Sequence, residues 1–172
     1  MWNTGGGNIR ETIKKAEKVL MEKVKEEWKN ELRMQSRLNT YCVFKSDFGV
    51  ENYVTINLPR YIRSFIAKLR SSTLPIRIET GRFERLSREE RICKFCDNQD
   101  IESEYHYMFE CLLYNDLRND LFAYIKNFYP NFEYIGDCEQ WKILMTDKAI
   151  VPRTGKFIKL AFERRNNVTY RC

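Results

Sequence analysis

Three cysteines and one histidine lie within a single short stretch of the chain, ICKFCDNQDIESEYHYMFEC. They are Cys93, Cys96, His106 and Cys111, spaced C-x2-C-x9-H-x4-C, and His106 is the only histidine in the sequence. Thiolate and imidazole are the ligands that Zn²⁺ prefers in closed tetrahedral sites. A C-x2-C turn can direct two sulfurs at one ion, and a helix start or a loose turn could direct His106 and Cys111 inward. The spacing therefore predicts a structural zinc site held by these four residues.

Other interpretations use the same residues. A C-x2-C pair can be a redox couple, and buried thiols with a core histidine could come together by chance. Zinc is favoured because the only histidine falls at ligand spacing. A catalytic zinc with Glu104 as its base is disfavoured, because four protein ligands leave no position for a water molecule.

The composition is that of a folded protein: 172 residues, 43% hydrophobic and 31% charged. The sequence has no run of eighteen apolar residues and no apolar segment at its start, so we expect neither a membrane span nor a secretory signal. We expect an intracellular protein of the nucleus or cytoplasm, where clustered cysteines indicate metal binding more often than disulfides. Cys42, Cys138 and Cys172 are scattered and are expected to be reduced thiols.

The net charge of +6 is concentrated in two segments. Residues 60–91 carry nine bases against four acids, and residues 153–171 carry six bases against one acid. Eight of the nine bases in the first segment are arginine, whose planar guanidinium suits phosphate. This pattern favours a polyanionic partner, although each arginine could equally belong to an ordinary solvated helix face.

Four regions must position these residues. Residues 1–38 are predicted to form a long amphipathic helix, a linker or docking helix, because apolar residues recur at steps of three and four. Residues 39–91 are predicted to be a basic helical region with an extended segment. Residues 92–130 hold the CCHC zinc knuckle and a following helix, and residues 131–172 form a helical basic tail. The fold class is therefore mostly α: a small helical domain with an embedded knuckle and a short extended segment.

The second of these regions gives three local predictions. Aromatic and β-branched residues over 38–56 indicate a loop with a short extended piece. Pro59 opens a helix, with Ile62, Ile66 and Leu69 on its buried face and Arg70 mostly outside it. Alternation over 76–81 then indicates an extended, exposed connection that carries Arg77 and Arg82.

Several short motifs follow one another in a fixed order around the knuckle. They are Leu69-Arg70, Ile78-Glu79, Gly81-Arg82, Glu90-Arg91, the four ligands with Glu102 and Glu104 between them, and Tyr114, Leu117 and Arg118. In this order they resemble the C-terminal zinc-binding region (zf-RVT type) of non-LTR, LINE-type retrotransposon reverse transcriptases. The likeness covers about residues 28–165.

The chain also departs from that family. Members often carry proline after the last cysteine, whereas Cys111 is followed by Leu112. No Asp-Asp pair is present to hold the two magnesium ions of a polymerase, and the acidic and histidine set of the element's endonuclease is also missing. The resemblance therefore implies the tail of a larger protein: a truncated reading frame, an excised copy or a domesticated descendant of a transposable element, without enzymatic activity.

The leading hypothesis is a non-enzymatic zinc module that binds RNA or DNA. The residues assigned to phosphates are Arg70, Arg77, Arg82, Arg85 and Arg91, and those assigned to stacking on unpaired bases are Phe83 and Phe95. Phe95 could instead be a hydrophobic plug under the zinc turn. The resemblance implies a role in gripping template RNA or target DNA during target-primed reverse transcription.

The alternative hypothesis is a structural or protein-interaction module. In it zinc only staples the fold, and the helix within residues 1–38 docks on a protein partner. Neither hypothesis involves a membrane or a small-molecule substrate.

Overall fold

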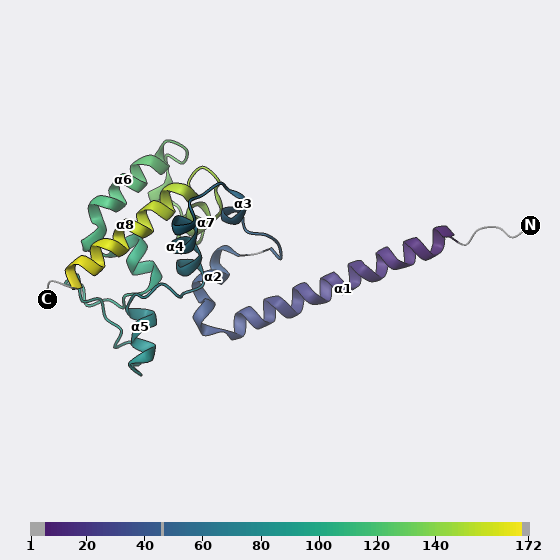
Figure 1. The fold of residues 1–172 in the computed structure, drawn as a ribbon, viewed down its shortest axis with the longest axis horizontal. Helices are drawn as coiled ribbons and strands as arrows, with labels where there is room; N and C mark the ends of the chain where they lie inside the picture. Colours follow the sequence, from purple (N-terminus) through teal and green to yellow (C-terminus); the bar gives the residue numbers. More distant parts are fainter. Residues whose placement is uncertain (1–5, 46, 170–172) are drawn as a thin grey trace, which may run out of the picture. The chain divides into compact units, whose positions relative to one another are not determined.

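The computed structural model describes residues 6–45 and 47–169, and the chain divides into two units, Met1–Asn39 and Thr40–Cys172. The first unit contains α1 (Gly6–Met34) followed by the short turn η1 (Ser36–Leu38) (Figure 1). α1 includes the apolar stripe seen in the sequence, and Ile9, Ile13 and Leu20 are exposed along it. The described part of this unit, taken by itself, is mainly the amphipathic helix α1.

The second unit is built from short helices. In chain order they are α2 (Asn39–Phe44), α3 (Asn52–Thr55), α4 (Arg60–Arg70), α5 (Arg77–Phe83), η2 (His106–Glu110), η3 (Leu112–Tyr114), α6 (Asn115–Lys126), η4 (Phe132–Tyr134), α7 (Asp137–Thr146) and α8 (Val151–Thr169). Residues 6–45 and 47–169 contain no β-strand, and their extended pairing is limited to one isolated antiparallel bridge. The mostly helical class is confirmed. Among the described residues, none of the helices combines the length and the apolar character that a membrane crossing requires.

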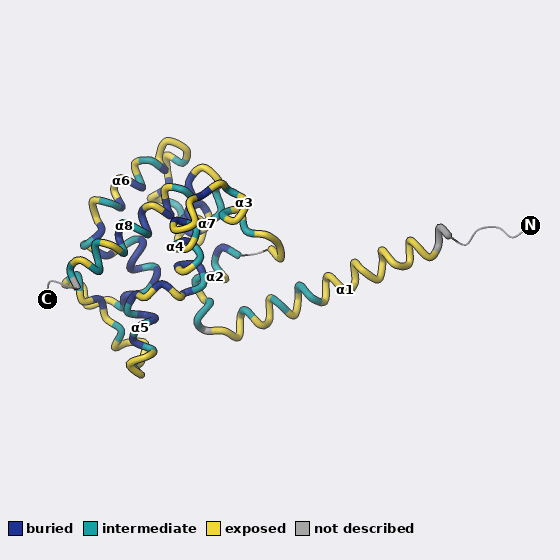
Figure 2. The backbone as a smooth tube through the Cα atoms, viewed as in Figure 1, coloured by how far each residue is buried: buried dark blue, intermediate teal, exposed yellow. Residues whose placement is uncertain are grey.

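The core of the second unit lies where α8 packs against α4, α6 and α7 (Figure 2). Its largest fully buried side chains include Ile66, Leu69, Leu74, Ile76, Tyr107, Met108, Tyr114, Ile125, Phe132, Leu144, Met145 and Ile150. Gly155 lets α8 approach α4 closely, since a Cβ there would lie 2.5 Å from Ile62 Cγ2 and 2.8 Å from Ile66 Cδ1. The unit therefore depends on a tight α4–α8 contact.

Two predictions about α4 and the segment before it are wrong. Within residues 38–56, where a loop with a short extended piece was predicted, the described residues form the helices α2 and α3 and no strand. Arg70 is only 2% exposed and lies inside the buried face of α4. Its guanidinium pairs with Glu51 and donates to the Met145 carbonyl at 2.9 Å. It also lies over the rings of Tyr41, Phe44 and Tyr53. The aromatic residues that suggested a strand surround this arginine, and tertiary packing overrides their strand preference.

The segment 76–81 is also not the extended connection that its alternation predicted. Most of it belongs to α5, where Ile78 and Glu79 are buried. The helix receives its N-terminal cap from outside, because the carboxylate of Glu102 accepts the Arg77 N–H at 2.6 Å. The first N–H groups of a helix have no partner within it, so this distant carboxylate stabilises a helix that its own sequence does not mark.

Candidate metal centre

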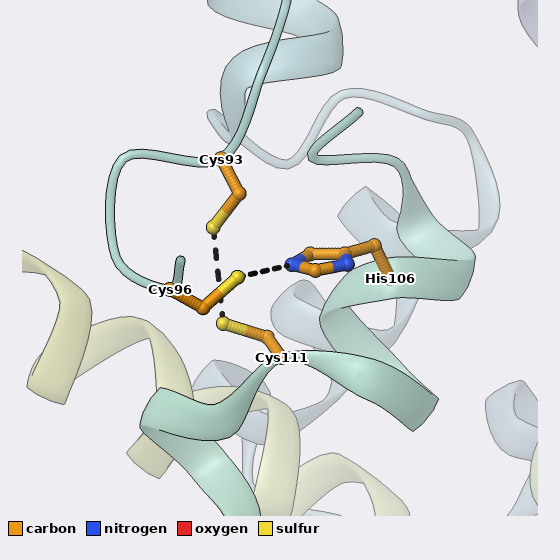
Figure 3. Close-up of side chains that lie close together, drawn as sticks. All are labelled: Cys93, Cys96, His106 and Cys111. Carbon is orange, nitrogen blue, oxygen red and sulfur yellow. Dashed lines mark hydrogen bonds between the residues drawn. The ribbon is translucent and has the colours of Figure 1, made fainter. Parts of the chain in front are cut away.

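Cys93 and Cys96 lie on a loop whose two ends are paired. Ile92 and Ile101 form the antiparallel bridge, and the Cys93 N–H donates to the Asp100 carbonyl at 2.8 Å. The backbone between them turns back on itself, and the two sulfurs point to the same side (Figure 3). The loop thus provides one half of a ligand set.

His106 and Cys111 lie at the two ends of a π-helical turn, η2. The Cys111 N–H donates to the His106 carbonyl at 2.8 Å, which closes a turn one residue wider than that of an α-helix. In an α-helix, residues five apart point about 140° away from each other, so the wider turn is what directs both side chains toward the loop. The Ser103 hydroxyl accepts the His106 N–H at 3.1 Å and fixes the start of the turn.

The four side chains predicted as ligands converge on one point (Figure 3). The Cys93 and Cys111 sulfurs are 3.8 Å apart, Cys96 Sγ lies 3.4 Å from His106 Nε2, and all four donor atoms lie within 4.8 Å of one another. Tetrahedral zinc with its usual bond lengths separates two sulfurs by about 3.8 Å, and a sulfur and a nitrogen by about 3.5 Å. Cys93, His106 and Cys111 are buried, and Cys96 is half-buried. The cluster could therefore hold a metal ion, and its donor set fits zinc.

Two carboxylates lie behind the histidine. His106 Nδ1 is 3.3 Å from Glu110 and 3.9 Å from Asp100, so its other nitrogen, Nε2, faces the sulfurs. Histidines that bind metal commonly donate their second N–H to a carboxylate, which fixes the tautomer and the ring orientation. Glu110 was not among the residues predicted from the sequence, although its position four residues after His106, one helical turn away, was a usable signal.

Replacing Glu110 with alanine is expected to weaken zinc binding by about tenfold, because the imidazole loses the acceptor that orients it. A competition titration against a chromogenic chelator measures the affinity. Glu110→Gln keeps an acceptor oxygen and should lose less, and Glu89→Ala removes an exposed acid outside the cluster and should have no effect. An unchanged affinity for Glu110→Ala would show that the contact does not position His106.

The ligands compete for protons when no metal is bound. A hydrogen bond with Cys111, together with burial, raises the pKa of Cys93 to about 12, and the same hydrogen bond lowers the pKa of Cys111. Burial opposes the charged form of His106, but the neighbouring Cys93 and Glu110 outweigh it and raise its pKa. Metal ligands must be deprotonated, so metal binding releases protons and its affinity increases with pH.

Arg118 supports the π turn from α6. Its buried guanidinium donates to the Met108 carbonyl at 2.9 Å and to the Cys111 carbonyl at 2.7 Å. Carbonyls at the end of a helical turn lack partners within it, and these two hydrogen bonds satisfy them. Arg118 had no predicted role, and here it holds the backbone of Cys111.

A buried ion pair connects the ligand segment to α8. Arg165 donates from Nε and Nη2 to the two oxygens of Glu102, at 2.8 and 3.0 Å, and Glu102 is only 1% exposed.

The Arg165 guanidinium also lies 4.9 Å from the centre of the Phe95 ring. Phe95 is half-buried against the core, which matches a plug under the loop better than a surface for stacking bases. Nothing local in the sequence links residues 63 positions apart.

Two of the arginines assigned to phosphates point inward. Arg70 is held by Glu51 inside the core. Arg91 donates to the Ile78 carbonyl at 3.0 Å and, from two nitrogens, to the Leu86 carbonyl at 3.2 and 2.7 Å. Both guanidinium groups thus contact partners within the fold, and of the two only Arg91 keeps part of its side chain exposed.

Two further arginines are paired with acids on or next to α5. Arg77 forms an ion pair with Glu84, and Arg82 lies 3.6 Å from Glu79. Arg82 keeps about a third of its side chain exposed, whereas Arg77 keeps 14%. Arg82 can therefore reach a ligand more readily than Arg77.

The remaining predicted residues are exposed at the end of α5. Phe83 is 81% exposed, and Arg85 follows it on the surface. Arg88, which was not among the predicted residues, is exposed beside them. Together with Arg82 they form a segment, 82–88, that we call the α5 arm; α5 lies at the lower edge of the second unit (Figure 1). A large aromatic ring exposed among bases is the arrangement that single-strand binders use.

Comparisons with family models, curated proteins and solved structures find no match for this chain. The interpretation of its function therefore depends on the residues and contacts of the chain itself. These are a Cys3His cluster able to hold a metal ion, carboxylates that orient its histidine, and an exposed aromatic residue among bases.

Proposed function

We propose that this chain is a zinc-binding, non-catalytic module that binds nucleic acid, derived from the C-terminal region of a LINE-type reverse transcriptase. The observation that carries the proposal is the match between the donor separations of the Cys3His cluster and those of tetrahedral zinc. The retroelement origin is supported by the order of motifs around the cluster. Three unoxidised zinc thiolates suit a reducing compartment, the nucleus or cytoplasm.

A structural role for the zinc follows from the number and burial of its ligands. Four protein donors complete a tetrahedron and leave no position for a reacting water. Glu104, the candidate base of a catalytic site, is buried and accepts a hydrogen bond from the Thr40 hydroxyl at 3.3 Å. Small metal sites of this kind contribute directly to the free energy of folding.

The α5 arm is the part of the site that suits nucleic acid. Phe83 offers a ring for an unpaired base, and Arg82, Arg85 and Arg88 offer charge to the neighbouring phosphates. Template RNA and a nicked DNA target both present such single-stranded segments. The arm begins in the last turn of α5, and Glu102 caps the start of that helix, so the segment that contains the Cys3His cluster also positions the arm.

Phe83→Ala is expected to weaken binding of a single-stranded oligonucleotide by roughly tenfold, because stacking one base contributes about 1–3 kcal/mol. Arg85→Gln with Arg88→Gln should reduce the slope of log K against log salt by about 1.4, since each phosphate contact on a single strand contributes about 0.7. Fluorescence anisotropy over a salt series measures both. Phe128→Ala, at another exposed phenylalanine, is the matched control.

If Phe83→Ala and Phe128→Ala behave alike, the arm is not the contact. If the wild-type protein holds zinc but binds neither RNA nor DNA at low salt, the nucleic-acid function is wrong. The structural or protein-interaction role would then be the better account. The exposed apolar residues Ile9, Ile13 and Leu20 of α1 favour that second candidate.

A further inference from the structure

The two most closely packed helices of the second unit come from stretches without acids. No aspartate or glutamate occurs over 52–78, which contains α4, or over 148–162, which contains most of α8. The two stretches hold nine bases between them. Arg70 and Arg77 are largely buried, but Gly155 brings α8 close against α4, so exposed bases of the two helices lie on neighbouring elements.

The outer side of these helices is polar and basic. On α4 the residues Arg60, Ser64 and Lys68 are exposed at steps of four, along one row of the helix. On α8, Lys156 is exposed and Lys159 is half-buried. We call this surface the α4–α8 face.

One aromatic residue lies within the α4–α8 face. Tyr61 is 55% exposed, and the Lys159 ammonium lies 5.8 Å from the centre of its ring. Among the described residues of α4 and α8, Tyr61 is the one large apolar side chain that is fully on the surface. A protein interface usually buries a central apolar patch, which this face does not offer.

Acids at the border of the face neutralise part of its charge. Glu163 pairs with Lys159 at 2.6 Å, and Asp120 of α6 lines the same shallow hollow as Lys156. Lys68 and Lys156 form no ion pair within the described residues. On α6 and α7 the exposed lysines are instead paired, Lys126 with Glu133 and Lys142 with Glu139. Lys68 and Lys156 thus differ from the exposed lysines of α6 and α7, whose charge a neighbouring acid offsets.

We infer that the α4–α8 face is a second nucleic-acid surface, which binds the phosphates of a duplex. This inference rests on the proposed function and extends it: the α5 arm contacts an unpaired strand, and the α4–α8 face contacts the paired region beside it. Lysines and arginines without an aromatic ladder bind the backbone and carry no sequence information. The protein therefore has a preference for junctions between single and double strands, and no preference for sequence.

The test compares two pairs of substitutions that remove the same charge. Lys68→Gln with Lys156→Gln removes one lysine from each helix of the face, and Lys126→Gln with Lys142→Gln removes two paired lysines elsewhere. The probes are a 20-base-pair DNA duplex, the same duplex with a single-stranded tail, and the tail alone. Zinc content and circular dichroism verify that every variant is folded.

The first pair should weaken duplex and tailed-duplex binding by roughly tenfold and reduce the salt slope by about two, because each duplex contact contributes about 0.9. It should leave binding of the tail alone unchanged. Equal losses for both pairs, or no loss for the first, would overturn the inference while the proposed function stands. A wild-type protein that binds none of the probes would overturn both. A wild-type protein that binds the single-stranded tail but not the duplex would overturn the inference of a second surface and leave the proposed function standing.

Discussion

Cys111→Ser is expected to abolish stoichiometric zinc binding and to unfold the helical unit. Cys111 is buried at the end of the π turn, so the substitution removes one of the four candidate ligands from the closed side of the cluster. The same turn contributes Tyr107 and Met108 to the core. Structural zinc in small domains contributes on the order of 10 kcal/mol, which is comparable to the whole stability of a domain.

Zinc per chain is measured by mass spectrometry, and helix content by circular dichroism before and after chelation. His106→Ala should behave like Cys111→Ser. Cys138→Ser changes an exposed thiol outside the cluster and should keep full zinc and helix content. Stoichiometric zinc in both Cys111→Ser and His106→Ala would show that these residues are not the ligands, and zinc loss in Cys138→Ser would show that the ligand set is misassigned.

Arg165→Met is expected to reduce the free energy of unfolding by about 3–5 kcal/mol, because it leaves the Glu102 carboxylate buried without its counter-charge. Glu102 also caps α5, so the loss extends to the arm. Chemical denaturation of the zinc-loaded protein measures the change. Arg164→Met is the matched control: the neighbouring arginine pairs with the exposed Asp116, and its loss should cost at most about 1 kcal/mol.

A second background separates the buried charge from lost packing. In a Glu102→Gln protein, Arg165→Met leaves no buried carboxylate without its counter-charge. The substitution should therefore reduce the free energy of unfolding clearly less there than in the wild-type protein. Equal costs in the two backgrounds would mean that Arg165 acts through its contact with Phe95 and not through the ion pair.

The Cys3His cluster was predictable because its residues are close together in the sequence. Four ligands within nineteen residues, including the only histidine, favour a metal site strongly over a chance grouping, and the helical class followed from apolar periodicity. The position of Arg70 was also readable: it continues the row Ile62, Ile66, Arg70 at steps of four, on the buried side of α4. The prediction gave more weight to its charge than to its place on the helix.

The supports of the cluster were not predictable in this way. α5 is stabilised as a helix because Glu102, which follows the arm in the sequence, accepts the Arg77 N–H. Glu102 is held in turn by Arg165. No periodicity or short motif encodes contacts over 25 and 63 residues. Tertiary hydrogen bonds of this kind override the local preference, which here favoured an extended segment.

The Tyr107 hydroxyl, one residue beyond His106, donates to the Ile158 carbonyl in the middle of α8 at 2.7 Å. The ligand turn and the central helix are thereby joined, so they should open together. With zinc as the bound ion, each tenfold rise in its free concentration above the dissociation constant adds about 1.4 kcal/mol to the free energy of unfolding. Chains that open are those that proteases remove, so the steady-state abundance of this protein in a cell would follow the supply of zinc.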